Sequence, residues 1–206
     1  MLTLNVSYLR AALLSASTEE TRYYLRGVQI LRRGDHLRIT ATDGHRLFCA
    51  MQTADAAGPD FDIILPREGL KKALTGLHRD IEALALVLTH GESRITRAVL
   101  NDVGMQPIDG TFPSIERVVP SEISGELTQF NPVYLADLGK QAKILGAGPI
   151  GLHIGYNGQS PALITFAGID DAFAVLMPYR CTVAPLHRAA VVAIMGADRP
   201  AAEKAA

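Results

Sequence analysis

The 206-residue chain is poor in cysteine, in aromatic side chains and in excess charge of either sign. Its two cysteines, Cys49 and Cys181, lack the paired spacing of a metal site or a disulfide framework. The formal net charge of −1 excludes the broad basic surface of a dedicated nucleic-acid-binding protein, so any DNA contact must be local. Apolar runs such as LALVL are too short to span a bilayer, and the first ten residues lack the apolar centre of a signal peptide. We therefore expect a cytoplasmic protein with no membrane partner.

What the chain does contain is a core-forming share of hydrophobic residues, 48%, and a pattern that occurs three times. Each unit consists of a strand, a helix with apolar residues at helical spacing, and two or three further strands. The expected helices are SYLRAALLSAS, REGLKKALTGL and PVYLADLGKQAKIL, and the third unit is expected to open with a strand at ELTQFN. Hairpin-joined strands beside single helices predict an α+β fold of antiparallel sheets with helices on one face. The predicted units span residues 1–58, 59–121 and 122–180, followed by a short helix or tail over 181–206.

The most tempting chemical motif is GAGPIG, Gly146 to Gly151, which matches the glycine pattern of a dinucleotide fingerprint. Such a fingerprint must follow a strand and open a helix, because the helix N-terminus binds the pyrophosphate. Here a predicted helix precedes the glycines and a strand follows them. We interpret the motif as a glycine-rich helix stop.

Metal and nucleophilic chemistry have little support. The six histidines form no ligand-type grouping with each other or with cysteine, and Asp43 with His45 lacks a third ligand nearby. No G-x-S-x-G motif occurs, and Cys49 lies in an apolar strand where a buried, inert thiol is expected. Asp43 is better interpreted as a turn residue at the end of a strand. We predict no catalytic residue, no metal site and no cofactor.

Basic residues fall in all three predicted helices with few acidic neighbours: Arg10, Arg67, Lys71, Lys72, Lys140 and Lys143. If the helices share one face, that face is positive although the whole chain is not, and it would contact phosphates without reading bases. The alternative is that these are ordinary solvated helix faces.

Six separated segments resemble one family: TRYYLRG, ATDGHRL, ILPREGLKKAL, DGTFPSIERVVP, FNPVYLADL and AVLMPYR are similar to the bacterial DNA polymerase III beta subunit, the sliding clamp. The resemblance covers about residues 4 to 180, in the family's order. It implies the DNA-clamp fold, a closed ring with helices lining the hole and sheets outside, whose protomers have three domains of two such units each. Residues 1–121 resemble the middle domain and residues 122–180 the second half of the last domain, so the chain looks like a shortened member.

The resemblance implies a non-catalytic processivity factor for DNA replication that encircles double-stranded DNA and holds replicative or repair DNA polymerases by linear peptides. A clamp loader would open the ring. Since the family ring contains about twelve units, three units per chain predict a homotetramer, because closed rings repeat one heterologous interface. Two other interpretations stay open: a clamp-derived adaptor that binds peptides without encircling DNA, and a nucleotide-dependent enzyme that uses GAGPIG.

The resemblance also implies functional residues. The residues that match the family's peptide-binding cleft are Leu25, Thr42, Gly44, His45, Arg46, Leu47, Pro113, Arg117, Val118, Asn131, Tyr134, Val175, Met177, Pro178, Tyr179 and Arg180. Tyr179 stands where the family often has methionine. In these positions apolar groups would form the floor, and Arg46 and Arg180 would pair with carboxylates of the peptide. The residues expected to touch DNA are Arg22, Tyr23 and Tyr24, in addition to the six basic helix residues, with tyrosine able to stack on bases.

Overall fold

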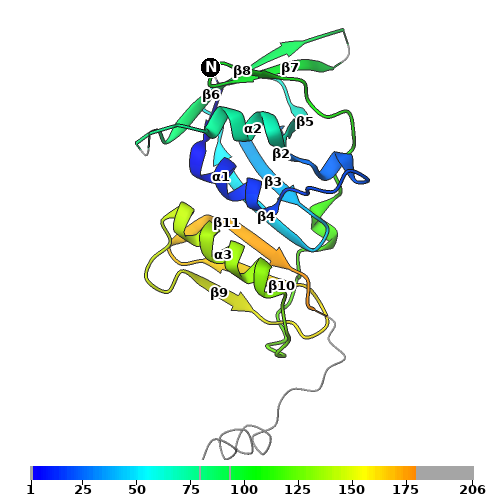
Figure 1. Ribbon diagram of the computed structural model, residues 1–206, viewed down its shortest axis with the longest axis vertical. Helices are drawn as coiled ribbons and strands as arrows, with labels where there is room; N and C mark the ends of the chain where they lie inside the picture. Colours follow the sequence, from blue (N-terminus) through cyan, green and yellow to red (C-terminus); the bar gives the residue numbers. More distant parts are fainter. Residues whose placement is uncertain (1, 79, 93, 180–206) are drawn as a thin grey trace, which may run out of the picture.

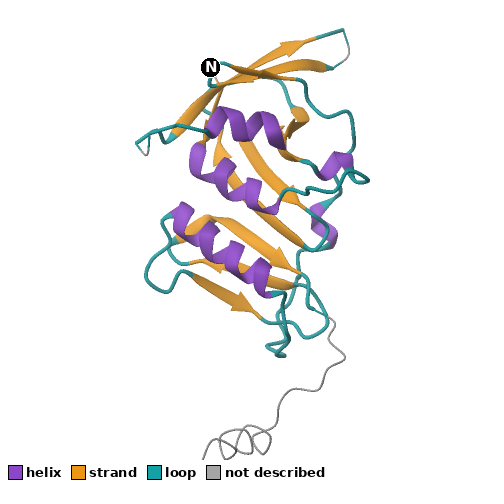
Figure 2. Cartoon of the chain, in the orientation of Figure 1, coloured by secondary structure: helices purple, strands orange, loops and turns teal. Residues whose placement is uncertain are grey.

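A computed structural model describes residues 2–78, 80–92 and 94–179, which form an α+β structure (Figures 1 and 2). Arg180 and the predicted extension over 181–206 lie outside the described residues. Residues up to 53 form β1 (Leu2–Asn5), α1 (Val6–Ser15), the 3-10 helix η1 (Tyr23–Leu25), β2 (Gly27–Arg33), β3 (His36–Thr42) and β4 (Arg46–Thr53). The next elements are β5 (Phe61–Pro66), α2 (Arg67–Leu74), β6 (Ala83–His90), β7 (Ile95–Leu100), β8 (Val103–Met105) and the 3-10 helix η2 (Ile115–Arg117). The last are α3 (Pro132–Leu145), β9 (Leu152–Gly155), β10 (Ala162–Phe166) and β11 (Ile169–Leu176).

The strands form two antiparallel sheets, one in the order β1-β6-β7-β8 and one in the order β5-β2-β3-β4-β11-β10-β9. The opening strands of residues 1–58 and 59–121 are exchanged between the sheets, since β1 pairs with β6 and β5 pairs with β2. The longer sheet continues across the join of β4 with β11, where Leu47 is opposite Val175. In Figure 1 the three α-helices lie on the same side of these sheets, with α1 between α2 and α3. This arrangement agrees with the predicted fold class.

Local sequence fixes where the helices begin and end. The Asn5 side chain accepts a hydrogen bond from the Tyr8 N–H at 3.1 Å, and the Asn131 side chain accepts one from the Val133 N–H at 3.0 Å. Both asparagines therefore cap helix N-termini, and Pro132 takes the first helical position, where it needs no N–H partner. Gly146 ends α3 in the left-handed conformation, with φ of +74°. The predicted role of GAGPIG as a helix stop is confirmed, and the strand β9 follows it.

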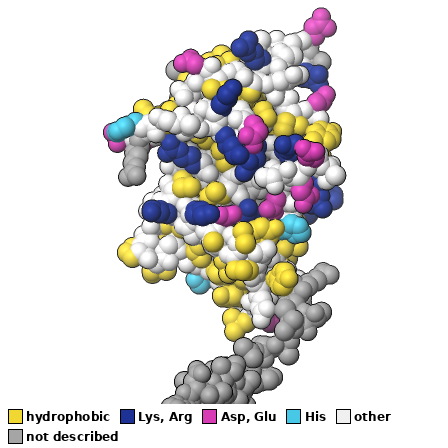
Figure 3. All heavy atoms as spheres, viewed as in Figure 1, with side chains coloured by type: hydrophobic (Ala, Val, Ile, Leu, Met, Phe, Trp, Pro, Cys, Tyr) yellow, Lys and Arg dark blue, Asp and Glu magenta, His cyan; other side chains and the backbone are white. Residues whose placement is uncertain are grey.

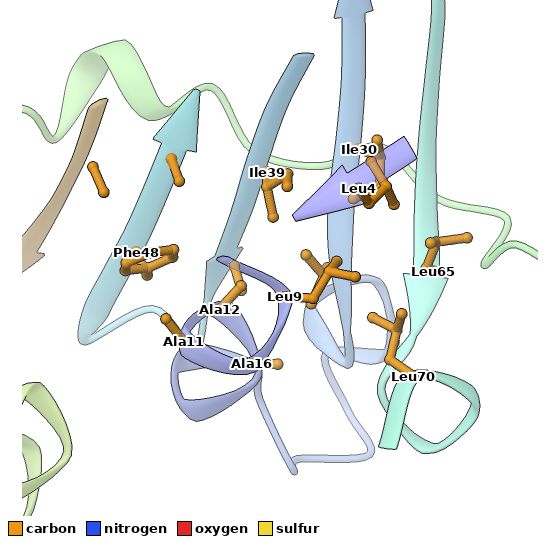
Figure 4. Close-up of a cluster of buried hydrophobic side chains, with 14 of the residues drawn as sticks. Leu4, Leu9, Ala11, Ala12, Ala16, Ile30, Ile39, Phe48, Leu65 and Leu70 are labelled. Atoms are coloured by element: carbon orange, nitrogen blue, oxygen red, sulfur yellow. The ribbon is translucent and has the colours of Figure 1, made fainter. Parts of the chain in front are cut away.

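One hydrophobic core connects all of these elements. In Figure 4, Leu9 and Ala12 of α1 point toward Ile30, Ile39 and Phe48 on the sheet. Leu138 and Ala142 of α3, together with Ile164 of β10, belong to the same cluster of buried side chains. Because the core does not stop at the join of β4 with β11, residues 122–179 are packed onto the rest rather than tethered to it.

Two local expectations differ from the structure. The strand expected at ELTQFN is absent, because the segment forms only scattered backbone hydrogen bonds, such as Tyr179 N–H to the Gln129 carbonyl at 2.7 Å. Conversely, β8 was not expected, and it pairs with β7 through a two-residue turn in which Asn101 and Asp102 have φ of +47° and +59°. Positive φ at both positions defines the type I′ hairpin turn, which asparagine tolerates well.

The outer edge of β1 is closed by side chains from β4 and from the segment that follows it. The Thr3 N–H donates to Asp55 Oδ1 at 3.1 Å, and the Asn5 N–H donates to Gln52 Oε1 at 2.9 Å. Gln52 also donates from Nε2 to the Thr3 carbonyl at 3.1 Å. By contrast, β8 and β9 each end a sheet, and no further strand lies beside either within the described residues. No described helix is long and apolar enough to cross a membrane.

Candidate functional site

An apolar cavity of about 160 Å³ opens where β4, β11 and the segment around η2 meet. It is lined by Leu25, Thr42, Gly44, His45, Arg46, Leu47, Pro113, Ser114, Ile115, Val118, Val175 and Met177. Beneath it lies a second cluster of buried side chains that includes Cys49, Ile64 and Phe112. The cavity therefore has a fixed floor, because its wall residues are continuous with a packed core.

Pairing of β4 with β11 brings together residues about 130 positions apart in the chain. Leu47 lies opposite Val175 in the strand pair. Just beyond the paired residues, the Met177 N–H donates a hydrogen bond to the His45 carbonyl at 2.9 Å. Leu47 and Val175 are buried, whereas Met177 is 39% exposed at the rim. The result is an apolar floor with a flexible, accessible thioether at its edge.

The turn that carries Gly44 and His45 is organised by Asp43. Asp43 Oδ1 accepts hydrogen bonds from the N–H groups of His45 at 2.9 Å and Arg46 at 3.0 Å, so Asp43 is the turn residue that the sequence predicted. Gly44 has φ of +90°, and a Cβ placed there would lie 2.6 Å from the Arg22 guanidinium. The positive φ favours glycine at this position, and a larger residue would also displace the end of the exposed Arg22 side chain.

A second, polar cavity of about 290 Å³ shares His45 and Arg46 with the first and opens toward α1 and α3. Here Arg46 donates from Nε to Asp43 Oδ2 at 3.0 Å and from Nη1 to Asp137 Oδ2 at 2.7 Å. Its guanidinium carbon lies 4.6 Å from the centre of the Tyr134 ring, which is also stacked on His45. Arg46 was expected to pair with a carboxylate of a bound peptide, but its guanidinium already binds two carboxylates of its own chain.

Burial and hydrogen bonding set the pKa values around the cavities. Burial acts to raise the pKa of Asp137, but hydrogen bonds from Lys140 and Arg46 outweigh it and lower that pKa. Hydrogen bonds from Ser114, from its own backbone and from Arg38 lower the pKa of Glu116 to about 2. Burial raises the pKa of the Cys49 thiol, which agrees with an inert cysteine. Each of these three groups therefore keeps one protonation state near neutral pH.

Of the residues predicted for the cleft, the structure brings ten into the lining of the apolar cavity. Tyr134 lines the polar cavity instead, and Asn131 caps α3. The exposed Arg117 lies beside the lining residue Val118 and borders a separate shallow cavity. Pro178 and Tyr179 follow Met177 but do not line either cavity, and Arg180 lies outside the described residues.

Sequence reasoning missed two residues of the apolar cavity, Ser114 and Ile115. Both belong to the start of η2, where Ile115 is buried and the Ser114 hydroxyl donates to Glu116. The signal was the segment FPSIERVVP, in which an isolated isoleucine among polar residues marks a short, docked turn. It also missed Asp137, since nothing in the sequence links that residue to Arg46.

The predicted DNA-contacting residues lie on the helix side of the molecule. Figure 3, in the view of Figure 1, shows Lys and Arg side chains gathered over the helix layer. Lys72 and Lys143 are exposed and form no ion pair with another described residue, whereas Lys71 pairs with Glu68 at 3.2 Å and Lys140 with Asp137 at 2.7 Å. Arg10 and Arg67 are half-buried, and Arg67 also contacts Glu68.

Tyr23 and Tyr24 form the first two residues of η1, Arg22 precedes them, and Leu25 of the same short helix lines the apolar cavity. Arg22 and Tyr23 are exposed, Tyr24 is half-buried, and the two rings meet edge to face at 5.7 Å. Arg22 forms a loose ion pair with Glu19 at 3.7 Å. Within the described residues no three histidine, cysteine, aspartate or glutamate side chains gather as metal ligands.

This fold, with its continuous antiparallel sheet, one-sided helix layer and cavity at the join of two units, is that of the DNA-clamp class. A family model described as the DNA polymerase III beta subunit, central domain, matches residues 6–114. Since that match covers more than half of the chain, the chain belongs to the DNA polymerase III beta subunit family.

Individual relatives agree with this assignment. The beta sliding clamp of Streptococcus pneumoniae is 28% identical over 134 residues, which are 65% of this chain and 35% of that protein. The beta sliding clamp of Pseudomonas aeruginosa is 36% identical over 105 residues, 50% of this chain and 28% of that protein. The matched residues thus span about a third of the length of these relatives.

Solved structures agree on the fold. The beta subunit of Streptococcus pyogenes DNA polymerase superimposes with a TM-score of 0.69 at 16% identity, covering 87% of this chain and 66% of that one. The Pseudomonas aeruginosa sliding clamp crystallised with a ligand gives 0.66 at 23% identity, covering 87% and 65%.

Proposed function

We propose that this chain acts as a DNA sliding clamp, a non-catalytic processivity factor that holds replicative or repair polymerases through linear peptides bound in the apolar cavity. The observation that carries the proposal is the gathering of ten matched residues from four separate segments around one cavity. Chance packing would not select these positions together, because they come from η1, from β4 with its preceding turn, from the η2 segment and from β11. The proposed site of action is the cytoplasm, where bacterial DNA is replicated.

The chemistry of the cavity suits one large apolar side chain of an extended peptide. A volume of about 160 Å³ is close to that of engineered apolar cavities that bind benzene, about 150 Å³. Leu47 and Val175 would form the floor, and Met177 would adapt to leucine, methionine or phenylalanine in the partner. Tyr134 and His45, which stack on each other, would support the peptide where it leaves the cavity.

The helix layer supports the DNA part of the proposal. Exposed Lys72, Lys143 and Lys71 on α2 and α3 would contact phosphates, and such contacts require no base readout. Arg22 and Tyr23 are exposed near η1, where the tyrosine ring would be available for stacking on an unpaired base. Arg10 and Arg67 would make secondary contacts.

We also propose the domain division and the assembly. Residues 1–121 would be one middle-domain-like body, residues 122–180 half of a C-terminal-like domain, and residues 181–206 an extension. A homotetramer would close the ring, with the free edge of β9 in one copy meeting the free edge of β8 in the next. Support comes from the position of these edges at opposite ends of the elongated molecule in Figure 1. A clamp loader would place such a ring on DNA.

Peptide binding is tested with a fluorophore-labelled synthetic nonapeptide that contains one leucine and one phenylalanine, measured by fluorescence anisotropy. The double variant His45→Ala, Met177→Ala should bind at least about tenfold more weakly, because it removes both rims of the cavity. The matched control is Met51→Ala, since Met51 is 43% exposed on β4 but does not line the cavity. Unchanged affinity in the double variant contradicts the cleft assignment.

The ring is tested by mass and by topology. Light scattering should give a mass of about four chains, and nicked circular plasmid DNA should retain the loaded protein until a restriction enzyme linearises it. A stable monomer contradicts the ring. A protein that binds the nonapeptide but treats circular and linear DNA alike is the adaptor, the second candidate function. Dinucleotide binding is not supported, because a strand rather than a helix follows GAGPIG.

A further inference from the structure

Arg46 belongs to the wall of the apolar cavity, but its charged end lies elsewhere. The groups that hold its guanidinium are Asp43, Asp137 and Tyr134, which line the polar cavity and not the apolar one. The charged groups of Arg46 and Asp137 are therefore occupied inside the protein, with their side chains only 12% and 15% exposed. Arg46 therefore connects the cavity wall to α3.

The hydrogen bonds around the Arg46 guanidinium form one continuous network. Asp137 lies on α3, 91 positions from Arg46, and its second oxygen accepts a hydrogen bond from Lys140 Nζ at 2.7 Å. Asp43 joins the same guanidinium through Oδ2 and holds the His45 N–H through Oδ1. The turn at the mouth of the apolar cavity is thus fixed to α3 through two carboxylates.

We infer that Asp137 is a positioning residue for the peptide-binding cleft: by holding Arg46 it fixes the turn of Asp43, Gly44 and His45 against α3, although it would not touch the peptide itself. This inference rests on the proposed function of the cleft. Without the Asp137 carboxylate, Arg46 keeps its hydrogen bond to Asp43 and its contact with the Tyr134 ring, but it loses the hydrogen bond that ties the turn to α3. The cavity mouth then samples other conformations, and each bound peptide must reorder it.

The experiment measures the affinity of the labelled nonapeptide for Asp137→Asn and for Asp171→Asn. Asp171 is the matched control, because its carboxylate also reaches the N-terminal part of the chain, by accepting a hydrogen bond from Tyr8 on α1, but it does not contact the turn. Asp137→Asn should weaken binding about tenfold, equivalent to one charge-assisted hydrogen bond. Asp171→Asn should bind within about twofold of the unmodified chain. Equal losses in both variants overturn the inference, since they indicate a general effect of loosening α1, α3 and β11.

Two further variants separate positioning from a loss of folding. Asp137→Glu keeps the carboxylate and should recover at least part of the lost affinity, whereas a variant that has lost its fold would show a strongly lowered or missing thermal transition. In a double-mutant cycle, Asp137→Asn combined with Arg46→Gln should be no weaker than Arg46→Gln alone, because both changes break the same path. Additive losses overturn the inference.

The unmodified chain is measured first. If it does not bind the nonapeptide, the proposed function fails. The positioning role of Asp137 then fails with it, because that role rests on peptide binding. If it binds and Asp137→Asn binds equally well, only the positioning role of Asp137 fails.

Discussion

At Asp137, burial and hydrogen bonding act on the pKa in opposite directions, and hydrogen bonding has the larger effect. The folded-state pKa therefore lies below the value of about 3.9 expected for an unfolded aspartate. The Arg46 and Lys140 contacts stabilise the fold fully above that value, and the stabilisation is lost as the pH falls through the lower, folded-state pKa.

The lowered pKa of Asp137 predicts that its contribution to the free energy of unfolding depends on pH. Asp137→Asn should unfold more easily than the unmodified chain at pH 6, by about 1–2 kcal/mol in the free energy of unfolding. As the pH falls below about 3.9 and through the lowered folded-state pKa, the difference should shrink, because the Asp137 carboxyl of the unmodified chain also becomes neutral. Urea titrations at pH 6 and at pH 2.5 measure both values. A difference that stays constant between the two pH values would show that the charge of Asp137 has no part in it.

Gly44 provides a second prediction at this scale. Gly44→Ala should destabilise the fold by about 1–2 kcal/mol because of its positive φ. It should also weaken nonapeptide binding, because the added Cβ displaces the Arg22 guanidinium at the cavity rim. Gly34→Ala is the control, since Gly34 also has positive φ, +58°, but open space around it. Thermal melts and fluorescence anisotropy of both variants separate the two effects, and identical peptide affinities would show that Arg22 does not shape the rim.

Sequence reasoning predicted the residues of the apolar cavity better than their roles. Leu47, Val175 and Met177 line the cavity, as the resemblance to the family's cleft segments implied. The binding of Arg46 to Asp43 and Asp137 was not foreseen, since an arginine beside a cleft has no sequence feature that shows which carboxylates of its own chain bind it. That information depends on the packing of α3, 91 positions away.

Among the elements, hydrophobic periodicity predicted the positions of the three helices and most strands. It did not predict which strands pair with each other. The exchange of β1 and β5 between the sheets has no local signal, because both strands are short apolar runs that would fit either sheet. The hairpin of β7 and β8 did have a local sequence signal, the Asn101-Asp102 pair, but the sequence interpretation placed that pair in a loop. The ELTQFN segment resembles a strand but lacks a partner along its length.

The hairpin gives a prediction at the scale of the element. Asp102→Gly should stabilise the fold by about 0.5–1 kcal/mol, because asparagine-glycine is the preferred pair for this turn and aspartate at φ of +59° is strained. Asp35→Gly is the control, since Asp35 occupies the tight turn between β2 and β3 but does not have positive φ. Asp35→Gly should gain nothing and lose a few tenths of a kcal/mol through backbone entropy. Thermal denaturation compares the two variants. A lower stability of Asp102→Gly would contradict the claim that aspartate is strained at this position.

At the scale of the whole molecule, the shared core predicts a single unfolding transition. Leu9, Phe48, Leu138 and Ile164 belong to one buried cluster although they come from opposite ends of the described chain. Far-UV circular dichroism and the near-UV signal of the tyrosines should therefore change at the same urea concentration. A first transition that removes only the near-UV signal from Tyr134 and Tyr156 would show that residues 122–179 unfold separately. Tyr134→Phe and Tyr156→Phe identify the source of that signal.

The closure of β1 by Gln52 and Asp55 bears on how copies of the chain would join. Of the other three sheet edges, β5 is covered in part by the Ile108 N–H, which donates to the Ile64 carbonyl at 2.9 Å, while β8 and β9 have no described strand beside them. If the β9 edge of one copy pairs with the β8 edge of the next, the contact runs head to tail, as a closed ring requires. In the proposed tetramer this makes every subunit equally necessary. A copy with one altered edge strand would leave its ring open, so adding such copies should reduce the share of closed rings by more than their own share of the chains.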